Sequence, residues 1–156
     1  MKLNPNVFDL WVYHKAEGVP RYLLLYTSQE KADKWFNGAR FWQIPSDFVE
    51  EEEEIETALQ RVLKKCDLRA RSLWAVEHAY TFYNRRFKEI QICTVYAAQV
   101  QKPSKPKLTA SHSAFGWFPY QECIEKLNFR GLLEGLFWTK KYVTDAEREF
   151  TELRLV

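Results

Sequence analysis

The sequence predicts an α/β fold, a sandwich in which helices cover both faces of a mixed β-sheet. Two patterns predict it: strand-like segments lie on both sides of one strongly amphipathic helix, and helix-like segments follow the last strand. The composition fits a folded core, since 46% of the 156 residues are hydrophobic and 16% are aromatic. This length is typical of one domain, so we expect residues 1–156 to form a single domain.

The first third of the chain is predicted to contain three strands. Residues 7–14 alternate in polarity and residues 22–27 are mostly apolar, and Gly18 and Pro20 between them indicate a hairpin turn. The charged segment that follows predicts a loop or short helix over residues 28–38, and residues 41–45 predict a short strand.

The best-defined element is a helix that begins near Ile55. Apolar residues recur there at helical spacing, at positions 55, 58, 59, 62, 63 and 66. Five consecutive glutamates, residues 50–54, come immediately before it. We expect them at the first turn of the helix, where carboxylates complement the positive end of the helix dipole. The alternative, a metal-binding patch, is disfavoured because consecutive residues on a helix point in different directions.

The second half of the chain is predicted to be a hairpin, one more strand and then helices. Residues 73–83 and 87–100 form the expected hairpin, with its turn at residues 84–86, and residues 115–118 form a short strand. Pro119 is suited to begin a helix, and Asn128 to cap the next one. Thr144 and Glu147 have the spacing of a capping box, which predicts a short charged helix near the end of the chain.

Charge and cysteine content exclude several classes of protein. The 23 lysines and arginines and 21 acids give a net charge of +2, which is too balanced to indicate a nucleic-acid-binding domain. The three cysteines have no C-x-x-C spacing, so neither a zinc site nor a redox motif is predicted. The longest aliphatic run, residues 23–25, is too short to cross a membrane, and residues 1–5 do not resemble the start of a secretory signal. We therefore expect a cytoplasmic protein without a membrane partner.

The segment over residues 42–68 reads WQIPSDFVEEEEEIETALQRVLKKCDL, and it resembles the signature of the Nudix hydrolase (MutT-like) superfamily. That signature has a tryptophan or similar residue, then P-G-G, then a helix that carries R-E-x-x-E-E-x-G. Trp42 and Pro45 keep their spacing, Glu53 takes the place of the first glutamate, and Arg61 that of the arginine. The resemblance covers residues 6–142 and implies a Nudix-type α/β/α sandwich in which a Glu53–Arg61 pair braces the loop before the helix.

The sequence departs from this signature where the family binds its divalent metals. The positions of the metal-binding glutamates read Val62, Lys65 and Cys66. Mg²⁺ and Mn²⁺ prefer hard oxygen ligands, whereas valine offers none, lysine adds a positive charge and cysteine is soft. We therefore predict impaired catalysis and assign no cofactor. If the protein is active, Mg²⁺ or Mn²⁺ is implied, with Glu53 and Glu56 as the candidate ligands.

A second stretch resembles the closing half of Nudix enzymes that act on nucleoside triphosphates or dinucleoside polyphosphates. His112 lies five residues before Trp117, and an apolar helix follows. In those enzymes an acid often precedes the histidine, whereas this chain has Ser111. The resemblance makes His112 a candidate ligand-binding residue, and a loop histidine with ordinary hydrogen bonds is the alternative.

The remaining candidates are basic and aromatic side chains. Arg61 and Lys65 are one helical turn apart, so both could bind a phosphate group where the family binds metal. A solvated lysine is the alternative for Lys65, and added core packing is the alternative for Val62 and Cys66. Trp42 is a candidate to stack on a nucleotide base. Arg85 and Arg86 form either a solvated hairpin tip or a phosphate contact.

Three functions are consistent with these observations. The first is a Nudix-type protein that has lost the usual metal site and keeps a pocket for a nucleotide-like phosphorylated small molecule or a protein. The second is an active pyrophosphohydrolase that recruits acids from residues 50–56 or from outside the signature. The third is a protein-interaction module without a small-molecule ligand.

Overall fold

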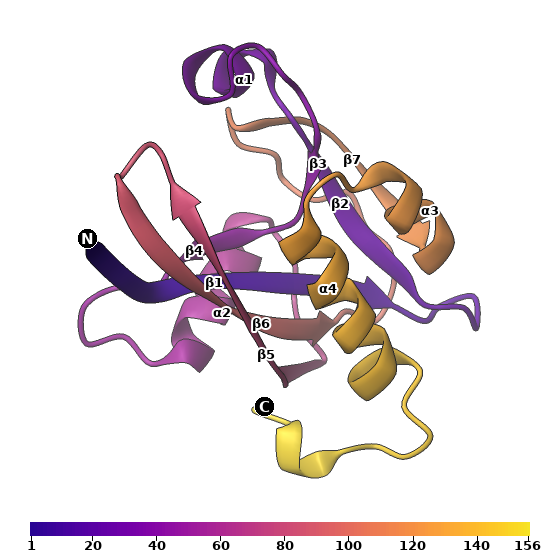
Figure 1. Ribbon diagram of the computed structural model, residues 1–156. Coiled ribbons are helices and arrows are strands. Elements are labelled where there is room, and N and C mark those ends of the chain that lie inside the picture. Colours follow the sequence, from indigo (N-terminus) through magenta and orange to yellow (C-terminus); the bar gives the residue numbers. More distant parts are fainter.

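A computed structural model describes residues 1–156 and confirms the α/β/α architecture (Figure 1). The seven strands are β1 (Lys2–His14), β2 (Arg21–Thr27), β3 (Trp42–Gln43), β4 (Ser46–Phe48), β5 (Ser72–Asn84), β6 (Glu89–Gln99) and β7 (His112–Pro119). The helices are α1 (Gln29–Trp35), α2 (Ile55–Lys65), α3 (Tyr120–Lys126) and α4 (Arg130–Thr139), followed by a π-helical turn (Lys140–Thr144) and a 3₁₀ turn (Thr151–Leu153).

All seven strands belong to one mixed sheet. Its order is β3-β2-β1-β6-β5, and β4 pairs with β1 while β7 pairs with β2. The central strands β1 and β6 run parallel, and the other pairs are antiparallel. The predicted hairpin of residues 7–14 and 22–27 is present, although β1 and β2 pair only at their joined ends.

Helices bury both faces of this sheet, as the alternation along β1 requires. Phe8, Leu10 and Val12 pack into one core with the apolar stripe of α2. Trp11 and Tyr13 point to the opposite face and pack into a second core with α3 and α4. Figure 1 shows α4 and α2 on opposite sides of the sheet. No helix is both long and apolar enough to cross a membrane.

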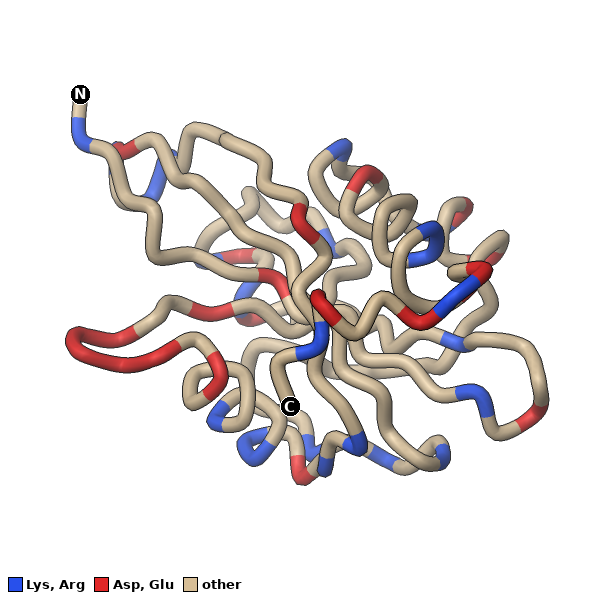
Figure 2. Tube along the Cα trace, turned by 90° about the horizontal axis from the view of Figure 1, so that it is seen from below, with Lys and Arg blue, Asp and Glu red and all other residues tan.

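Three sequence-based expectations for the helix ends are wrong. The glutamates at 50–54 lie in a turn before α2, where they form a projecting loop (Figure 2), and only Glu56 is in the first helical turn. Phe129, rather than Asn128, occupies the N-cap position of α4. The predicted capping box at Thr144 begins no helix, because Thr144 is buried and its hydroxyl is hydrogen-bonded to Tyr22 Oη at 2.6 Å.

Candidate functional site

A cleft of about 1400 Å³ opens beside the sheet. Its walls are α1 with the loop that follows it, the β5–β6 hairpin, and the start of α4, and its floor is formed by β1, β4 and β6. Ser28 anchors the α1 wall, since its hydroxyl accepts a hydrogen bond from Lys31 N at 3.1 Å and donates one to Ala110 O at 2.6 Å. The segment before β7 and helix α1 are thereby held together.

The cleft is more basic than the molecule as a whole. Only three carboxylates line it, from Asp9, Glu30 and Asp47. Its seven cations are Lys31, Lys34, Arg40, Lys65, Arg85, Arg86 and Arg130. Among them only Lys65 forms an ion pair, with Asp47 at 3.4 Å. Six of the cations therefore have no carboxylate partner, and they give the cleft a positive potential that favours an anion.

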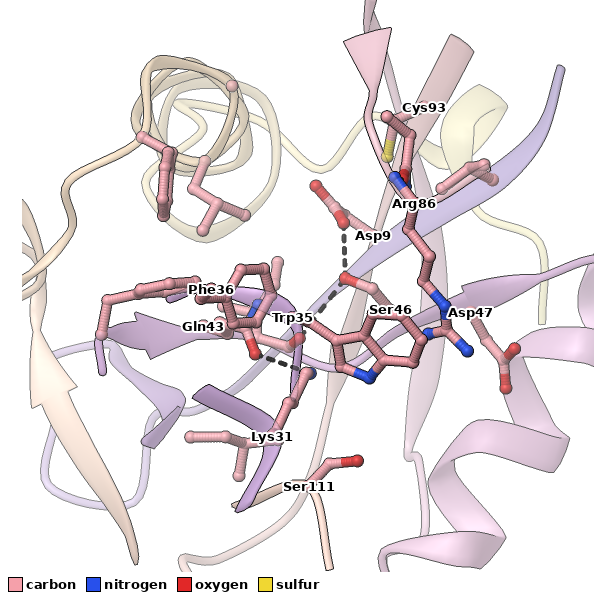
Figure 3. Close-up of a pocket in the computed structure, with 18 of the residues that line it drawn as sticks. Asp9, Lys31, Trp35, Phe36, Gln43, Ser46, Asp47, Arg86, Cys93 and Ser111 are labelled. Carbon is pink, nitrogen blue, oxygen red and sulfur yellow. Dashed lines mark hydrogen bonds between the residues drawn. The ribbon is translucent and has the colours of Figure 1, made fainter. Parts of the chain in front are cut away.

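Aromatic side chains line the same cleft, and one of them meets a cation across it. The Arg86 guanidinium lies 3.7 Å from the centre of the Trp35 ring (Figure 3). It lies 4.9 Å from the centre of the Phe87 ring. Phe87 in turn meets Phe48 edge to face at 5.7 Å. The end of α1 and the tip of the β5–β6 hairpin are thus joined by a cation–π contact. Flat, electron-rich groups and a positive charge are therefore available in one place.

The floor of the cleft holds a buried carboxyl group. Asp9 is only 4% exposed, and Ser46 Oγ donates a hydrogen bond to it at 2.6 Å (Figure 3). Tyr80 Oη donates a second hydrogen bond to the same carboxyl group. Burial raises the pKa of Asp9, and the two hydroxyl donors oppose this increase. No cation forms an ion pair with Asp9, so this group favours hydrogen-bond donors at the floor, in contrast to the basic walls.

His112 lies on another wall of the cleft, in contact with Gln43. Gln43 Oε1 accepts a hydrogen bond from Lys31 Nζ at 3.0 Å and lies 3.1 Å from His112 Nε2. Because an amide oxygen only accepts, the Nε2–H of the ring donates this second bond. Burial, together with the charge of Lys31, lowers the pKa of His112 to about 4. The histidine is therefore neutral near pH 7.

The free energy of unfolding is expected to fall as the pH falls from 7 to 5, and His112 should cause part of this loss. The folded-state pKa of about 4 is below the ordinary 6.5, so between these values the unfolded chain binds more protons. The contribution of His112 to the free energy of unfolding is thus fully present above pH 6.5 and is lost on acidification. The loss amounts to about 1–2 kcal/mol between pH 7 and 5. Urea unfolding of wild type and His112→Gln at both pH values tests this.

The difference in pH dependence between wild type and His112→Gln separates the effect of His112 from that of the other titrating groups. His14 also has a lowered pKa and acts in the same direction, whereas the raised pKa of Asp9 acts in the opposite one. Both groups are common to wild type and variant. An identical pH dependence in the two proteins would show that His112 is not held neutral by the fold.

The predicted Glu53–Arg61 pair is present, and it braces the loop before α2. Arg61 donates to Glu53 Oε2 through Nε at 2.9 Å and to Glu53 Oε1 through Nη2 at 2.9 Å. It also donates to Asp47 Oδ2 at 3.0 Å and to Phe48 O at 2.8 Å. The bonds from Arg61 are the main cause that lowers the pKa of Glu53 to about 2. Arg61 is thus occupied by the protein itself, and it does not line the cleft.

The residues at the signature's metal positions do not fit a divalent metal. Val62 is 5% exposed and packs in the core, and burial raises the pKa of the half-buried Cys66 thiol. Lys65 holds its ammonium group beside Asp47. Glu53 is committed to Arg61, and no group of three or more His, Cys, Asp or Glu side chains converges anywhere in the molecule. Hard oxygen ligands in the number that Mg²⁺ prefers are not assembled here.

Most of the other residues predicted from the sequence line the cleft, and one lies outside it. Lys65, Cys66, Val62 and His112 line it, but Trp42 does not. Trp42 packs against Tyr26, Phe118 and Lys126 beside α3. Sequence reasoning missed Asp9, Lys31, Tyr80 and the Trp35 ring, because these side chains meet only through pairings between distant strands and loops. Arg85 and Arg86 of the hairpin tip, which the sequence offered as a phosphate contact, also line the cleft.

The fold is that of the Nudix hydrolases. A NUDIX hydrolase structure from Listeria monocytogenes matches with a TM-score of 0.74 and 18% identity, over 91% of this chain and 96% of that one. The Ap4A hydrolase binary complex from C. elegans matches with a TM-score of 0.70 and 15% identity, over 94% of this chain and 100% of that one. The NUDIX domain of Shewanella oneidensis NrtR in complex with ADP ribose matches with a TM-score of 0.65 and 17% identity, over 90% of this chain and 91% of that one. No protein-family model and no curated protein matches this chain.

Proposed function

We propose that this protein binds a nucleotide-like phosphorylated small molecule in the cleft, through fixed cations rather than a bound metal, and that pyrophosphate hydrolysis is impaired. The observation that carries this proposal is the set of six cations without carboxylate partners on the walls of an aromatic cleft. Phosphate groups form charge-assisted hydrogen bonds with such cations, and a base can stack on the aromatic rings.

The chemistry of the structural neighbours supports the ligand class. One neighbour is named for Ap4A and another is complexed with ADP ribose, and both compounds join phosphates to a nucleoside. The departures at Val62, Lys65 and Cys66 support impaired hydrolysis, because these side chains cannot supply the oxygen ligands that Mg²⁺ prefers. We propose that the whole chain acts as one domain in the cytoplasm, which is consistent with its three free cysteines.

Within this proposal Arg86 and Lys31 take the role that the sequence assigned to Arg61. Arg86 lies over Trp35, so a ligand phosphate can approach its guanidinium while a flat ring approaches the indole. Lys31 is held by Gln43 and faces no carboxylate. Lys65 at the rim, whose side chain is 58% exposed, remains a predicted phosphate contact that would exchange its bond to Asp47 for one to the ligand.

A thermal-shift screen in EDTA tests the proposal. We expect at least one nucleoside mono-, di- or triphosphate, or ADP-ribose, at millimolar concentration to raise the melting temperature by about 2–4 °C. The shift should shrink with added salt, which screens the charges. Arg86→Gln should reduce it, whereas Arg69→Gln, which changes an exposed arginine outside the cleft, should not.

The alternatives predict different results in the same assays. If no phosphorylated compound stabilises the protein, ligand binding fails and the protein-interaction function takes its place. If Mn²⁺ addition releases phosphate or pyrophosphate from the bound compound, the protein is an active pyrophosphohydrolase with an unusual set of acids.

A further inference from the structure

A second hollow, of about 300 Å³, lies between the end of the sheet and the C-terminal segment. Its lining comes from the ends of β1 and β6, the start of β5, and residues 142–154. It shares no lining residue with the large cleft. Any ligand bound here would therefore be independent of the proposed nucleotide site.

Cations from three distant parts of the chain converge on this hollow, and two of them are unpaired. Arg148 pairs with Glu152 at 2.7 Å, and Arg154 pairs with Glu149 at 3.4 Å. Lys15 and Arg71 line the same hollow and form no ion pair. Glu149 is its only lining carboxylate. The hollow therefore carries an uncompensated positive charge that an anion would neutralise.

Two hydroxyl groups that line the hollow donate no hydrogen bond within the chain. Ser72 is 4% exposed, and its oxygen accepts a hydrogen bond from Trp74 Nε1 at 2.9 Å, which leaves the hydroxyl proton free. Tyr13 is 2% exposed, and no hydrogen bond within the chain engages its hydroxyl. Burial raises the pKa of Tyr13, so this group stays a donor at neutral pH. Both hydroxyl groups therefore have a proton available for an acceptor that enters this basic hollow.

The walls of the hollow are held in place before any ligand binds. Arg71 N donates to Gln99 O at 2.6 Å, and Leu155 N donates to Leu73 O at 2.8 Å. An isolated bridge joins Trp74 and Arg154, which fixes the C-terminal segment against β5. The backbone that carries these cations thus needs little rearrangement when an anion binds, and a preformed wall of this kind favours binding.

We propose that this hollow is a binding site for a phosphate group, either free phosphate or a phosphate monoester on a protein side chain. Arg71 and Lys15 supply the two positive charges that match a dianion. The hydroxyl groups of Tyr13 and Ser72 donate to its oxygens from the floor. Arg148 and Arg154 lie at the edge, with their charges already balanced by glutamates.

Thermal-shift titrations with inorganic phosphate, at constant ionic strength set with sodium chloride, test this site. We expect saturating phosphate to raise the melting temperature by about 2–4 °C. Arg71→Gln should weaken the affinity at least about tenfold, since it removes a charged hydrogen-bond donor. Arg69→Gln is the matched control, two residues away and outside the hollow, and should bind like wild type. Tyr13→Phe should weaken binding without removing a charge.

NMR titration locates the site and separates it from the cleft. We expect shifts at the amides of Ser72 and Gln99, and the same phosphate response in the cleft variant Arg86→Gln. Loss of the response in Arg86→Gln, or its survival in Arg71→Gln, would overturn the second site but leave the nucleotide proposal intact.

A second comparison distinguishes free phosphate from a phosphate monoester on a protein. O-phosphoserine and a phosphoserine peptide are each compared with the unphosphorylated form, and tighter binding of the peptide indicates a protein ligand. Equal responses to phosphate and to acetate would show general screening instead.

Discussion

Replacing Arg61 with leucine is expected to lower the free energy of unfolding by about 2–3 kcal/mol, because it removes charge-assisted hydrogen bonds at a mostly buried position. The Arg61 side chain is 21% exposed, and its guanidinium joins Glu53, Asp47 and the Phe48 carbonyl oxygen in one network. Leucine is apolar, so Glu53 loses its cation and Asp47 keeps only Lys65 as a partner. Urea unfolding at pH 7 measures the loss.

Two further variants show which property of Arg61 is responsible for its contribution to stability. Arg61→Lys keeps the charge but replaces a planar fork by a single ammonium group, so we expect an intermediate loss. Arg69→Leu removes an exposed arginine without ion pairs, and its midpoint should stay close to that of wild type. A midpoint for Arg61→Leu equal to that of Arg69→Leu would mean that the network contributes nothing to stability.

The elements that the sequence predicted correctly depend on short-range patterns. The apolar stripe of α2 repeats within three turns, and its buried residues Ala58, Leu59, Val62 and Leu63 are those that the spacing indicated. The hairpin of β5 and β6 has its turn at the expected arginines. The Glu53–Arg61 pair was expected from the family resemblance. In each case the interacting residues are close in sequence or lie in one motif.

The errors arise where tertiary contacts override a local signal. Glu53 is tied to Arg61, and Glu53 Oε1 also accepts a hydrogen bond from Glu50 N at 3.1 Å, so the acidic run is held as a turn instead of extending α2. Thr144 cannot cap a helix while its hydroxyl contacts Tyr22, which is 122 positions away. The Asp9–Tyr80 bond spans 71 positions, and no sequence pattern indicates it. The cleft floor could therefore be found only in the assembled sheet.

Restoring the glutamates by the triple variant Val62→Glu, Lys65→Glu and Cys66→Glu should destabilise the protein and create metal affinity. Val62 is 5% exposed and Cys66 is half-buried in the same core. A carboxylate at either position costs roughly 1 to 3 kcal/mol when unpaired. The change at Lys65 also removes the ion pair with Asp47 and adds a negative charge beside it. Without metal, the urea midpoint should therefore fall well below that of wild type.

Mn²⁺ should reverse part of this loss in the triple variant only. Three new carboxylates on one helix face, close to Asp47, supply the hard oxygen ligands that wild type lacks. At one hundred times the dissociation constant, a bound ion stabilises the fold by about 2.7 kcal/mol. Calorimetric titration should find no micromolar Mn²⁺ site in wild type, and the exposed single variant Lys64→Glu should behave like wild type. A micromolar site in wild type would show that other acids already bind metal. A triple variant as stable as wild type and indifferent to Mn²⁺ would mean that positions 62, 65 and 66 do not face a common metal position.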